Sequence, residues 1–192
     1  MGSTSSPPDE VLSAKIVIAG GFGVGKTTLV SAVSEVPPLN TEAWMTEAST
    51  GVDELGADAD KATTTVAMDF GRVQLHEDLV LFLFGTPGQG RFWFLWDDLS
   101  RGALAAVVLV DTRRLHESFA AVDYFEHDAG VPFVVALNLF DGVLVHDPEE
   151  VRDALALPEH VPVVTGDVRD LNSTVDILRS SVRNALQQVV HD

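Results

Sequence analysis

The sequence predicts an α/β protein: a three-layer sandwich whose sheet is mostly parallel and includes one antiparallel hairpin strand. Two observations predict this fold. Short apolar runs typical of buried strands alternate with helix-forming segments along most of the 192 residues. One early pair of strands is joined only by the polar residues His76-Glu77-Asp78, and such a short connection makes the pair antiparallel.

Six apolar runs bounded by polar, Gly or Pro residues are predicted to be strands. In chain order they cover residues 15–19, 66–75, 79–84, 105–110, 132–138 and 161–165. Between the first two, residues 35–62 hold seven acidic residues, no basic residue before Lys61 and no clean hydrophobic period. We therefore expect a long mobile loop there, with an acidic surface that attracts basic partners.

Helices are predicted between these strands. The first follows the glycine-rich segment 20–28, and the others cover 91–101, 115–128, a segment that begins at 147–150, and 171–189. Asp147-Pro148-Glu149-Glu150 is a helix start, because it combines a capping carboxylate, an early proline and acidic residues in the first turn. In the last helix, Ser173 and Asp176 have the spacing of a capping box.

The helix predicted at 91–101 is rich in aromatic residues. Phe92, Leu95, Trp96 and Leu99 recur at helical spacing, so we expect this face to pack into the core. Trp93 and Phe94 then point elsewhere, and an exposed aromatic pair suits binding to a protein partner.

Composition excludes several classes of function. Acidic residues outnumber basic ones 29 to 12, giving a net charge of −17 that is incompatible with nonspecific nucleic-acid binding and is repelled by anionic membranes. The absence of cysteine excludes disulfides, zinc thiolate sites and thiol catalysis. No run approaches the ~20 apolar residues of a membrane span, so we expect a cytoplasmic protein.

The length predicts a single domain over residues 14–192, preceded by a flexible tail at 1–13. The first six residues formally match a myristoylation pattern. Ser and Pro dominate the first eight residues, however, and this composition favours a flexible tail.

The strongest chemical signal lies between the first strand and the first helix. Gly20-x4-Gly25-Lys26-Thr27 is a complete P-loop pattern, in which backbone amides wrap the β-phosphate of a nucleotide. The lysine reaches the β- and γ-phosphates, and the threonine hydroxyl binds Mg²⁺. The residues expected to contact the nucleotide are Gly20, Gly21, Phe22, Gly23, Val24, Gly25, Lys26, Thr27 and Thr28. The fold is therefore predicted to be that of a P-loop NTPase.

With its later motifs in matching order, the chain resembles the Ras-like small GTPases. The resemblance implies that Thr65 is the switch threonine over Mg²⁺ and the γ-phosphate, with Thr63 and Thr64 near enough to compete for that role. It implies that the Gly88 amide senses the γ-phosphate and that Gln89 orients the attacking water. The catalytic residues so implied are Lys26, Thr65 and Gln89, and the metal ligands are Thr27 and Thr65.

Gly85 departs from that family, because it stands where the resemblance places an aspartate linked to Mg²⁺. We therefore expect very slow unaided hydrolysis, with Gln89 poorly placed until a partner orders its loop. No arginine lies within residues 27–71 to act as an internal arginine finger, and Arg72 and Arg91 are weak substitutes.

Two further segments resemble the family's guanine pocket. Asn138-Leu139-Phe140-Asp141 corresponds to Asn-Lys-x-Asp, in which the aspartate accepts hydrogen bonds from guanine N1 and N2. Leu139 replaces the lysine whose stem covers the base. Thr165-Gly166-Asp167 matches the loop that completes the pocket, although an ordinary strand-to-helix turn explains it equally well. The ligands implied are GTP and GDP, held by Asn138, Leu139, Asp141, Thr165, Gly166 and Asp167.

A narrower resemblance is to the actinobacterial conservon-type GTPases, relatives of the gliding protein MglA. It covers about residues 14–190 and rests on the segments 20–27, 64–71, 85–89 and 91–99. The resemblance implies two partners, a roadblock/LC7-type regulator and a sensor-kinase-like membrane protein. It also implies a cytoplasmic protein that its partners recruit to the membrane.

These features predict a GTP-binding molecular switch with slow, partner-stimulated hydrolysis. One alternative is a nucleotide-bound scaffold that never turns over, which Gly85 and Leu139 motivate. Another is a P-loop ATPase or a kinase of a small metabolite. Such a kinase would need a lid with several arginines, and only Arg113-Arg114 are clustered.

Overall fold

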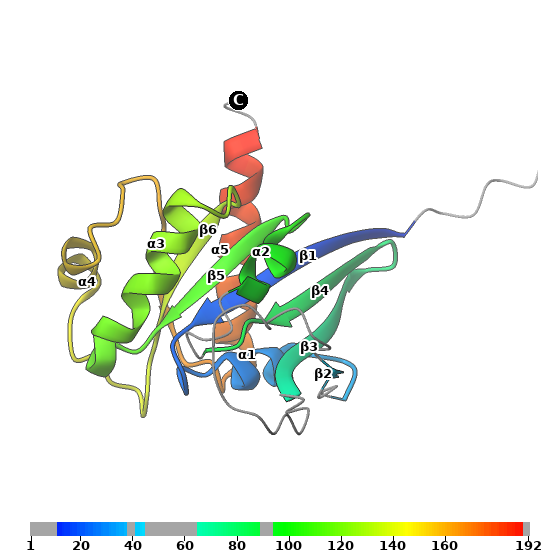
Figure 1. Cartoon of the computed structure of the whole chain (residues 1–192), viewed down its shortest axis with the longest axis horizontal. Coiled ribbons are helices and arrows are strands. Elements are labelled where there is room, and N and C mark those ends of the chain that lie inside the picture. Colours follow the sequence, from blue (N-terminus) through cyan, green and yellow to red (C-terminus); the bar gives the residue numbers. More distant parts are fainter. Residues whose placement is uncertain (1–10, 38–40, 45–64, 89–93, 190–192) are drawn as a thin grey trace, which may run out of the picture.

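The computed structural model describes residues 11–37, 41–44, 65–88 and 94–189. Within them lies a seven-stranded sheet in the order β2-β3-β4-β1-β5-β6-β7, flanked by helices (Figure 1). The strands are β1 Leu12–Gly20, β2 Thr41–Trp44, β3 Thr65–His76, β4 Leu79–Gly85, β5 Ala105–Val110, β6 Phe133–Asn138 and β7 Val163–Gly166. The helices are α1 Lys26–Val33, α2 Phe94–Ser100, the 3-10 helix η2 Thr112–Ser118, α3 Phe119–His127, α4 Pro148–Ala154 and α5 Leu171–Val189.

The sheet is mostly parallel, as the sequence predicts. Neighbouring strands from β4 through β1, β5 and β6 to β7 all run parallel. Strand β3 is antiparallel to both of its neighbours, β2 and β4, and forms the predicted hairpin with β4. The fold class is therefore confirmed, with β3 as the one reversed strand in this part of the chain.

Two apolar layers hold the helices to the sheet. Every residue of β5 and β6 is buried, because helices cover both faces of these central strands. Val108 and Val110 of β5 belong to the cluster packed against α2, α3 and α4. Val107 and Leu109, which alternate with them, belong to the cluster packed against α1 and α5. The α/β sandwich is thus three layers thick.

Several predicted element boundaries are wrong. The segment expected to be loop at 35–62 contains β2, which pairs with β3, while residues 45–64 lie outside the described residues. The helix expected at 115–128 begins as the 3-10 helix η2. The capping box at Ser173 and Asp176 is wrong as well, because Asp170 Oδ2 caps α5 by accepting from the Ser173 amide at 2.7 Å. The helix start at Asp147 is confirmed: its carboxylate caps α4, and Glu150 completes a capping box with it.

The aromatic helix α2 packs largely as expected. Trp96 and Leu99 are buried, and the Trp96 ring stacks on Phe125 and donates through Nε1 to the Pro87 carbonyl at 3.3 Å. Phe94 is 51% exposed, as the sequence predicts for a residue off the packed face. Phe92 and Trp93 lie outside the described residues.

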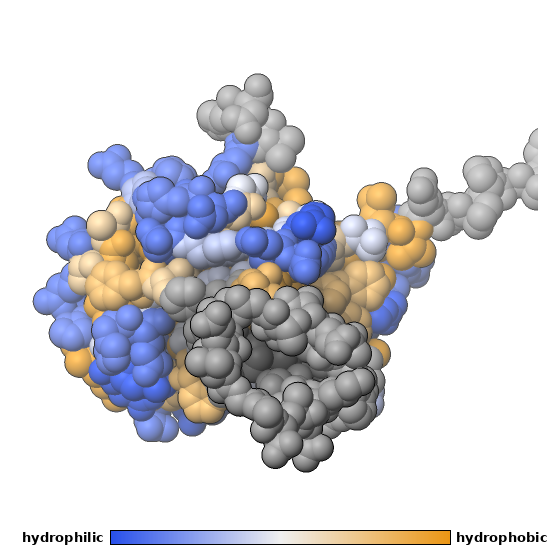
Figure 2. Space-filling model, viewed as in Figure 1, coloured by the Kyte–Doolittle hydropathy of each residue, from blue (hydrophilic) through white to orange (hydrophobic). Residues whose placement is uncertain are grey.

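The surface carries apolar residues where the sheet begins. Leu12, the first residue of β1, and Val11 before it are exposed. Hydrophobic colour gathers at the right of the view, where β1 begins (Figure 2). Among the described residues, no helix has both the length and the apolar character needed to cross a bilayer.

Gly71 of β3 gives the first testable prediction, because α1 lies directly against it. A Cβ at Gly71 would lie 2.7 Å from Val30 Cγ1 and 3.3 Å from Ser34 Cβ. Gly71→Ala should therefore lower the free energy of unfolding by about 1–3 kcal/mol, measured by urea denaturation. In Gly71→Ala/Val30→Ala the shortened side chain clears the space, so the double variant should lose less than the sum of the two single losses. Additive losses would contradict this packing argument.

Candidate functional site

The P-loop connects β1 to α1 and has the backbone that its glycines permit. Gly25 caps α1 in the left-handed region, at φ 109°, and a Cβ there would lie 2.8 Å from Asn138 Nδ2. At Gly20, φ is 134° and a Cβ would overlap the Leu109 carbonyl oxygen of β5. Both positions accept only glycine, for conformation and for space.

Lys26 is folded against this loop. Its Nζ donates to the Gly20 and Gly21 carbonyls at 2.9 and 2.7 Å, and the residue is only 8% exposed. Burial lowers the pKa of Lys26 to about 8, and the charges of Asp69 and Glu117 act in the opposite direction. The loop thus holds a buried ammonium group whose charge is sensitive to its neighbours.

Gly88, in the segment after β4, lies against the P-loop. A Cβ at Gly88 would come within 2.8 Å of Lys26 Nζ and 3.0 Å of the Gly21 carbonyl oxygen. The Thr86 amide anchors the start of this segment by donating to the Ile18 carbonyl at 2.8 Å. The structure therefore brings Gly88 beside Lys26, while Gln89 lies outside the described residues.

Asn138 positions the P-loop from the end of β6. The residue is 4% exposed, and its Nδ2 donates to the Val24 carbonyl at 2.9 Å. Its Oδ1 accepts from the Val168 amide at 3.3 Å. The side chain thus ties the P-loop to the connection between β7 and α5.

The two segments expected to form a base pocket lie side by side. The Leu139 amide donates to the Gly166 carbonyl at 3.0 Å. Thr165 and Gly166 end β7, and Asp167 follows directly after it. The side chain of Asp141 is 86% exposed, and its Oδ1 accepts from Arg169 Nη1 at 3.4 Å. Arg169 also binds Asp167 at 2.7 Å and lowers the pKa of that carboxyl.

Arg169 was not anticipated from the sequence. Its position two residues after Asp167 belongs to no motif considered above, and its role depends on the approach of Asp141 from another loop. Arg169 binds its near neighbour Asp167 locally, and only the assembled sheet brings Asp141 to the same guanidinium group.

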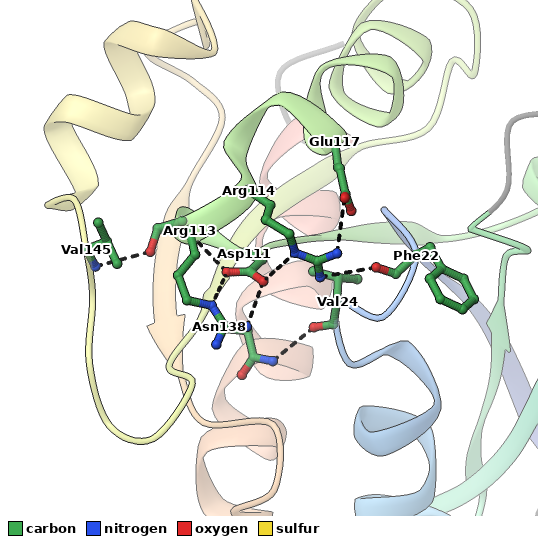
Figure 3. A network of polar contacts seen from close by, with 9 residues as sticks. Phe22, Val24, Asp111, Arg113, Arg114, Glu117, Asn138 and Val145 are labelled. Atoms are coloured by element: carbon green, nitrogen blue, oxygen red, sulfur yellow. Dashed lines mark hydrogen bonds and ion pairs between the residues drawn. The ribbon is translucent and has the colours of Figure 1, made fainter.

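A second polar network, centred on Asp111 at the end of β5, was also missed (Figure 3). Asp111 is buried and accepts from Arg113 Nε and Nη2, both at 2.8 Å, and from Arg114 Nε at 3.1 Å. The hydrogen bond from Arg113 is the main reason that the pKa of Asp111 falls to about 2. Asp111 is therefore ionised at neutral pH and fixes both arginines.

Arg114 carries this network to the P-loop. Its Nη1 donates to Glu117 at 3.0 Å and its Nη2 to the Phe22 carbonyl at 3.2 Å (Figure 3). Because Asp111, Glu117 and Phe22 all bind its guanidinium, Arg114 holds the loop in place. Arg72, one of the two weak substitutes for an arginine finger, is paired with Glu35 at 3.2 Å, and Arg91 lies outside the described residues.

The side of the loop where the sequence predicts a metal ion contains an unexpected carboxylate. Thr27 Oγ1 donates to Asp69 Oδ2 of β3 at 2.8 Å. Strand β3 begins at Thr65. The side chain of Thr65 and the whole of Thr63 and Thr64 lie outside the described part of the chain. Among the described residues no group of three or more His, Cys, Asp or Glu side chains could hold a metal ion. Thr27 and Asp69 nevertheless supply oxygen donors of the kind that Mg²⁺ prefers.

Comparisons with known proteins agree with this architecture. A family model described as "Conserved hypothetical ATP binding protein" matches residues 18–188. An uncharacterized protein of Methanocaldococcus jannaschii, MJ1339, is 32% identical over 106 residues, which are 55% of this chain and 54% of that protein. The chain thus spans about half the length of this curated relative.

Two solved structures show the same fold. The G domain of the T. maritima FeoB iron transporter has a TM-score of 0.58 and 17% identity, over 91% of this chain and 99% of that one. The Arl6 BBS3 small GTPase from Trypanosoma brucei, with bound GppNp, has a TM-score of 0.64 and 17% identity, over 92% and 99%. The fold is therefore that of P-loop small GTPases.

Asp111→Asn should lower the free energy of unfolding at pH 7 by about 2 kcal/mol, because the variant loses a carboxylate that two arginines stabilise. The folded pKa lies below the ordinary value, so this contribution is present above about pH 4 and lost as the pH falls toward 2. Urea denaturation should therefore show about half the difference at pH 3. Asp123→Asn, at a largely exposed carboxylate, is the matched control. A difference that does not change with pH would contradict the argument.

Proposed function

The chain belongs to the family described as conserved hypothetical ATP binding proteins. Within this nucleotide-binding family, we propose that the chain is a GTP-binding molecular switch with slow GTP hydrolysis. The observation that carries the choice of guanine is the position of Asp141. Its carboxylate lies beside the segment 165–167 and is tied to it through Arg169. A carboxylate only accepts hydrogen bonds, and guanine offers it two donors at N1 and N2.

The phosphate side of the site supports a switch. Lys26 supplies a full positive charge for the β- and γ-phosphates, and Gly88 lies close enough for its backbone to respond to a ligand there. A change at Gly88 is transmitted along the chain toward α2, whose Phe94 is exposed for a partner. Binding of the γ-phosphate would order this segment, and hydrolysis would release it.

Mg²⁺ belongs to this proposal as the ion that accompanies the nucleotide and neutralises phosphate charge. Thr27 would hold it, together with Thr65 from the start of β3. Gln89 would orient the attacking water, and the hydrolysis would stay slow until a partner orders the segment that carries Gln89.

The proposed partners follow from the resemblance to the conservon-type GTPases. They are a roadblock/LC7-type regulator and a sensor-kinase-like membrane protein, and the protein itself would be cytoplasmic. The net charge of −17 favours a basic surface on at least one partner, so the association should weaken as salt is added.

Three alternative functions are testable: an ATPase, a scaffold that binds nucleotide without turnover, and a kinase of a small metabolite. The family description names ATP binding, which is the observation in favour of the ATPase. A scaffold that binds nucleotide without turnover is separated from the switch by multiple-turnover phosphate release, with and without the roadblock-type partner. The small-metabolite kinase is less favoured, because Arg113 and Arg114 are both bound to Asp111.

Nucleotide preference tests the role of Asp141. GTP should displace a fluorescent guanine nucleotide at least about a hundredfold better than ATP, because adenine leaves the carboxylate without donors. Asp141→Asn should weaken GTP binding and strengthen binding of xanthosine triphosphate, whose base offers an acceptor where guanine offers the N2 donor. Equal displacement by ATP and GTP would contradict guanine recognition and support the ATPase.

Lys26→Ala should weaken GTP binding about a hundredfold or more, measured by calorimetry, because it removes a charge that contacts the phosphates. The control is Lys15→Ala. In the wild type the Lys15 ammonium donates to the Arg101 carbonyl, so this variant should bind GTP normally. Phosphates raise the pKa of Lys26 from about 8, so wild-type binding at pH 8.5 should take up protons. Unchanged affinity in Lys26→Ala would refute the phosphate site.

A further inference from the structure

Asp69 lies at a position where two strands meet beside the P-loop. In the antiparallel pair of β3 and β4, Asp69 is the direct partner of Gly85, the last residue of β4. Its Oδ2 accepts from Thr27 Oγ1 at 2.8 Å, and Thr27 is the second residue of α1. The carboxylate thus reaches across from the reversed strand to the hydroxyl of the P-loop.

The missing side chain of Gly85 leaves room for this carboxylate. A Cβ at Gly85 would lie 2.8 Å from Asp69 Cβ and 2.8 Å from Asp69 Oδ2. Both distances are shorter than a carbon makes with a non-bonded neighbour, so the space holds a side chain from 69 or from 85 but not both. Gly85 is outside the left-handed region. Its need for glycine therefore comes from space, not from conformation.

The chemistry of this contact suits a divalent cation. When the Thr27 hydroxyl donates its proton to Asp69, its oxygen lone pairs are left to face a metal ion. Mg²⁺ is usually held by one or two carboxylates together with phosphate oxygens and waters. Asp69 brings a negative charge to the P-loop hydroxyl, which is where the ion would need it.

The negative charge of Asp69 has opposite effects on nucleotide binding with and without Mg²⁺. The charge of Asp69 acts on Lys26 and raises its pKa against the effect of burial, so the two groups are close enough to interact. Without a cation, the same negative charge repels the phosphates of a nucleotide. A Mg²⁺ ion would attract both the carboxylate and the phosphates, so the charge of Asp69 would then favour nucleotide binding.

We propose that Asp69 is the carboxylate of the Mg²⁺ site, supplied by β3 in the space that Gly85 leaves on β4. The proposal rests on the nucleotide-binding function proposed above. It adds a carboxylate to a site for which the sequence predicts only Thr27 and Thr65 as ligands of Mg²⁺.

The first test removes the charge and keeps the shape. In the full chain, Asp69→Asn should weaken Mg²⁺ binding to the GDP complex by about 10–100-fold, measured by magnesium titration of a fluorescent GDP analogue. In EDTA the variant should bind GDP as well as or better than wild type, because the repulsion is gone. Asp123→Asn, which removes an exposed carboxylate on α3, should behave as wild type in both conditions.

The second test exchanges the two positions. Gly85→Asp alone should lower the melting temperature without strengthening Mg²⁺ binding, because its Cβ meets Asp69. The double variant Asp69→Gly/Gly85→Asp carries one carboxylate into the same space from β4, so its Mg²⁺ affinity should exceed that of Asp69→Asn by about tenfold. Circular dichroism of each variant checks that it folds.

The outcomes separate this proposal from the proposed function. A folded Asp69→Asn whose Mg²⁺ affinity stays within about twofold of wild type would overturn the assignment. So would wild-type GDP binding that Mg²⁺ does not change, although nucleotide binding itself would then stand. Failure of the wild-type protein to bind any nucleotide would overturn the proposed function, and this proposal with it.

Discussion

The P-loop of this protein is held in shape by hydrogen bonds that reach its carbonyl oxygens from three different elements. Lys26 of α1 binds the oxygens of Gly20 and Gly21, Asn138 of β6 binds that of Val24, and Arg114 of η2 binds that of Phe22. A loop with four glycines loses much conformational entropy when it is ordered. These bonds supply the constraint, and the elements that provide them also carry the other candidate site residues.

Sheet topology explains why these donors converge. Strands β1, β4, β5 and β6 run parallel, so their carboxyl ends lie along one edge. Gly20, Gly85, Asp111 and Asn138 stand at or just after those four ends. In an open parallel sheet this edge is where ligands bind, because the loops that leave it can approach one another without crossing the core.

The reversed strand β3 adds a residue that a parallel strand would not place there. Because β3 is antiparallel to β4, its first half lies at the same edge as the end of β4, and Asp69 thereby meets Gly85 and Thr27. Position 85 has no side chain and position 69 has a carboxylate because the space between the two strands holds only one of them. In the sequence only Gly85 is recognisable, as a departure from the pattern of the Ras-like GTPases.

Local patterns in the sequence determined the α/β class, the hairpin, most strands, the P-loop and the helix start at Asp147, since each depends on residues close together in the chain. They also predicted Gly88 and Asn138 as site residues, and the structure places both against the P-loop, with Asn138 bound to Val24 and Val168. The roles of Asp69, Arg114 and Arg169 were decided by tertiary structure. Each of these side chains has a partner on another strand or loop, and strand register, which no local pattern specifies, decides which of them meet.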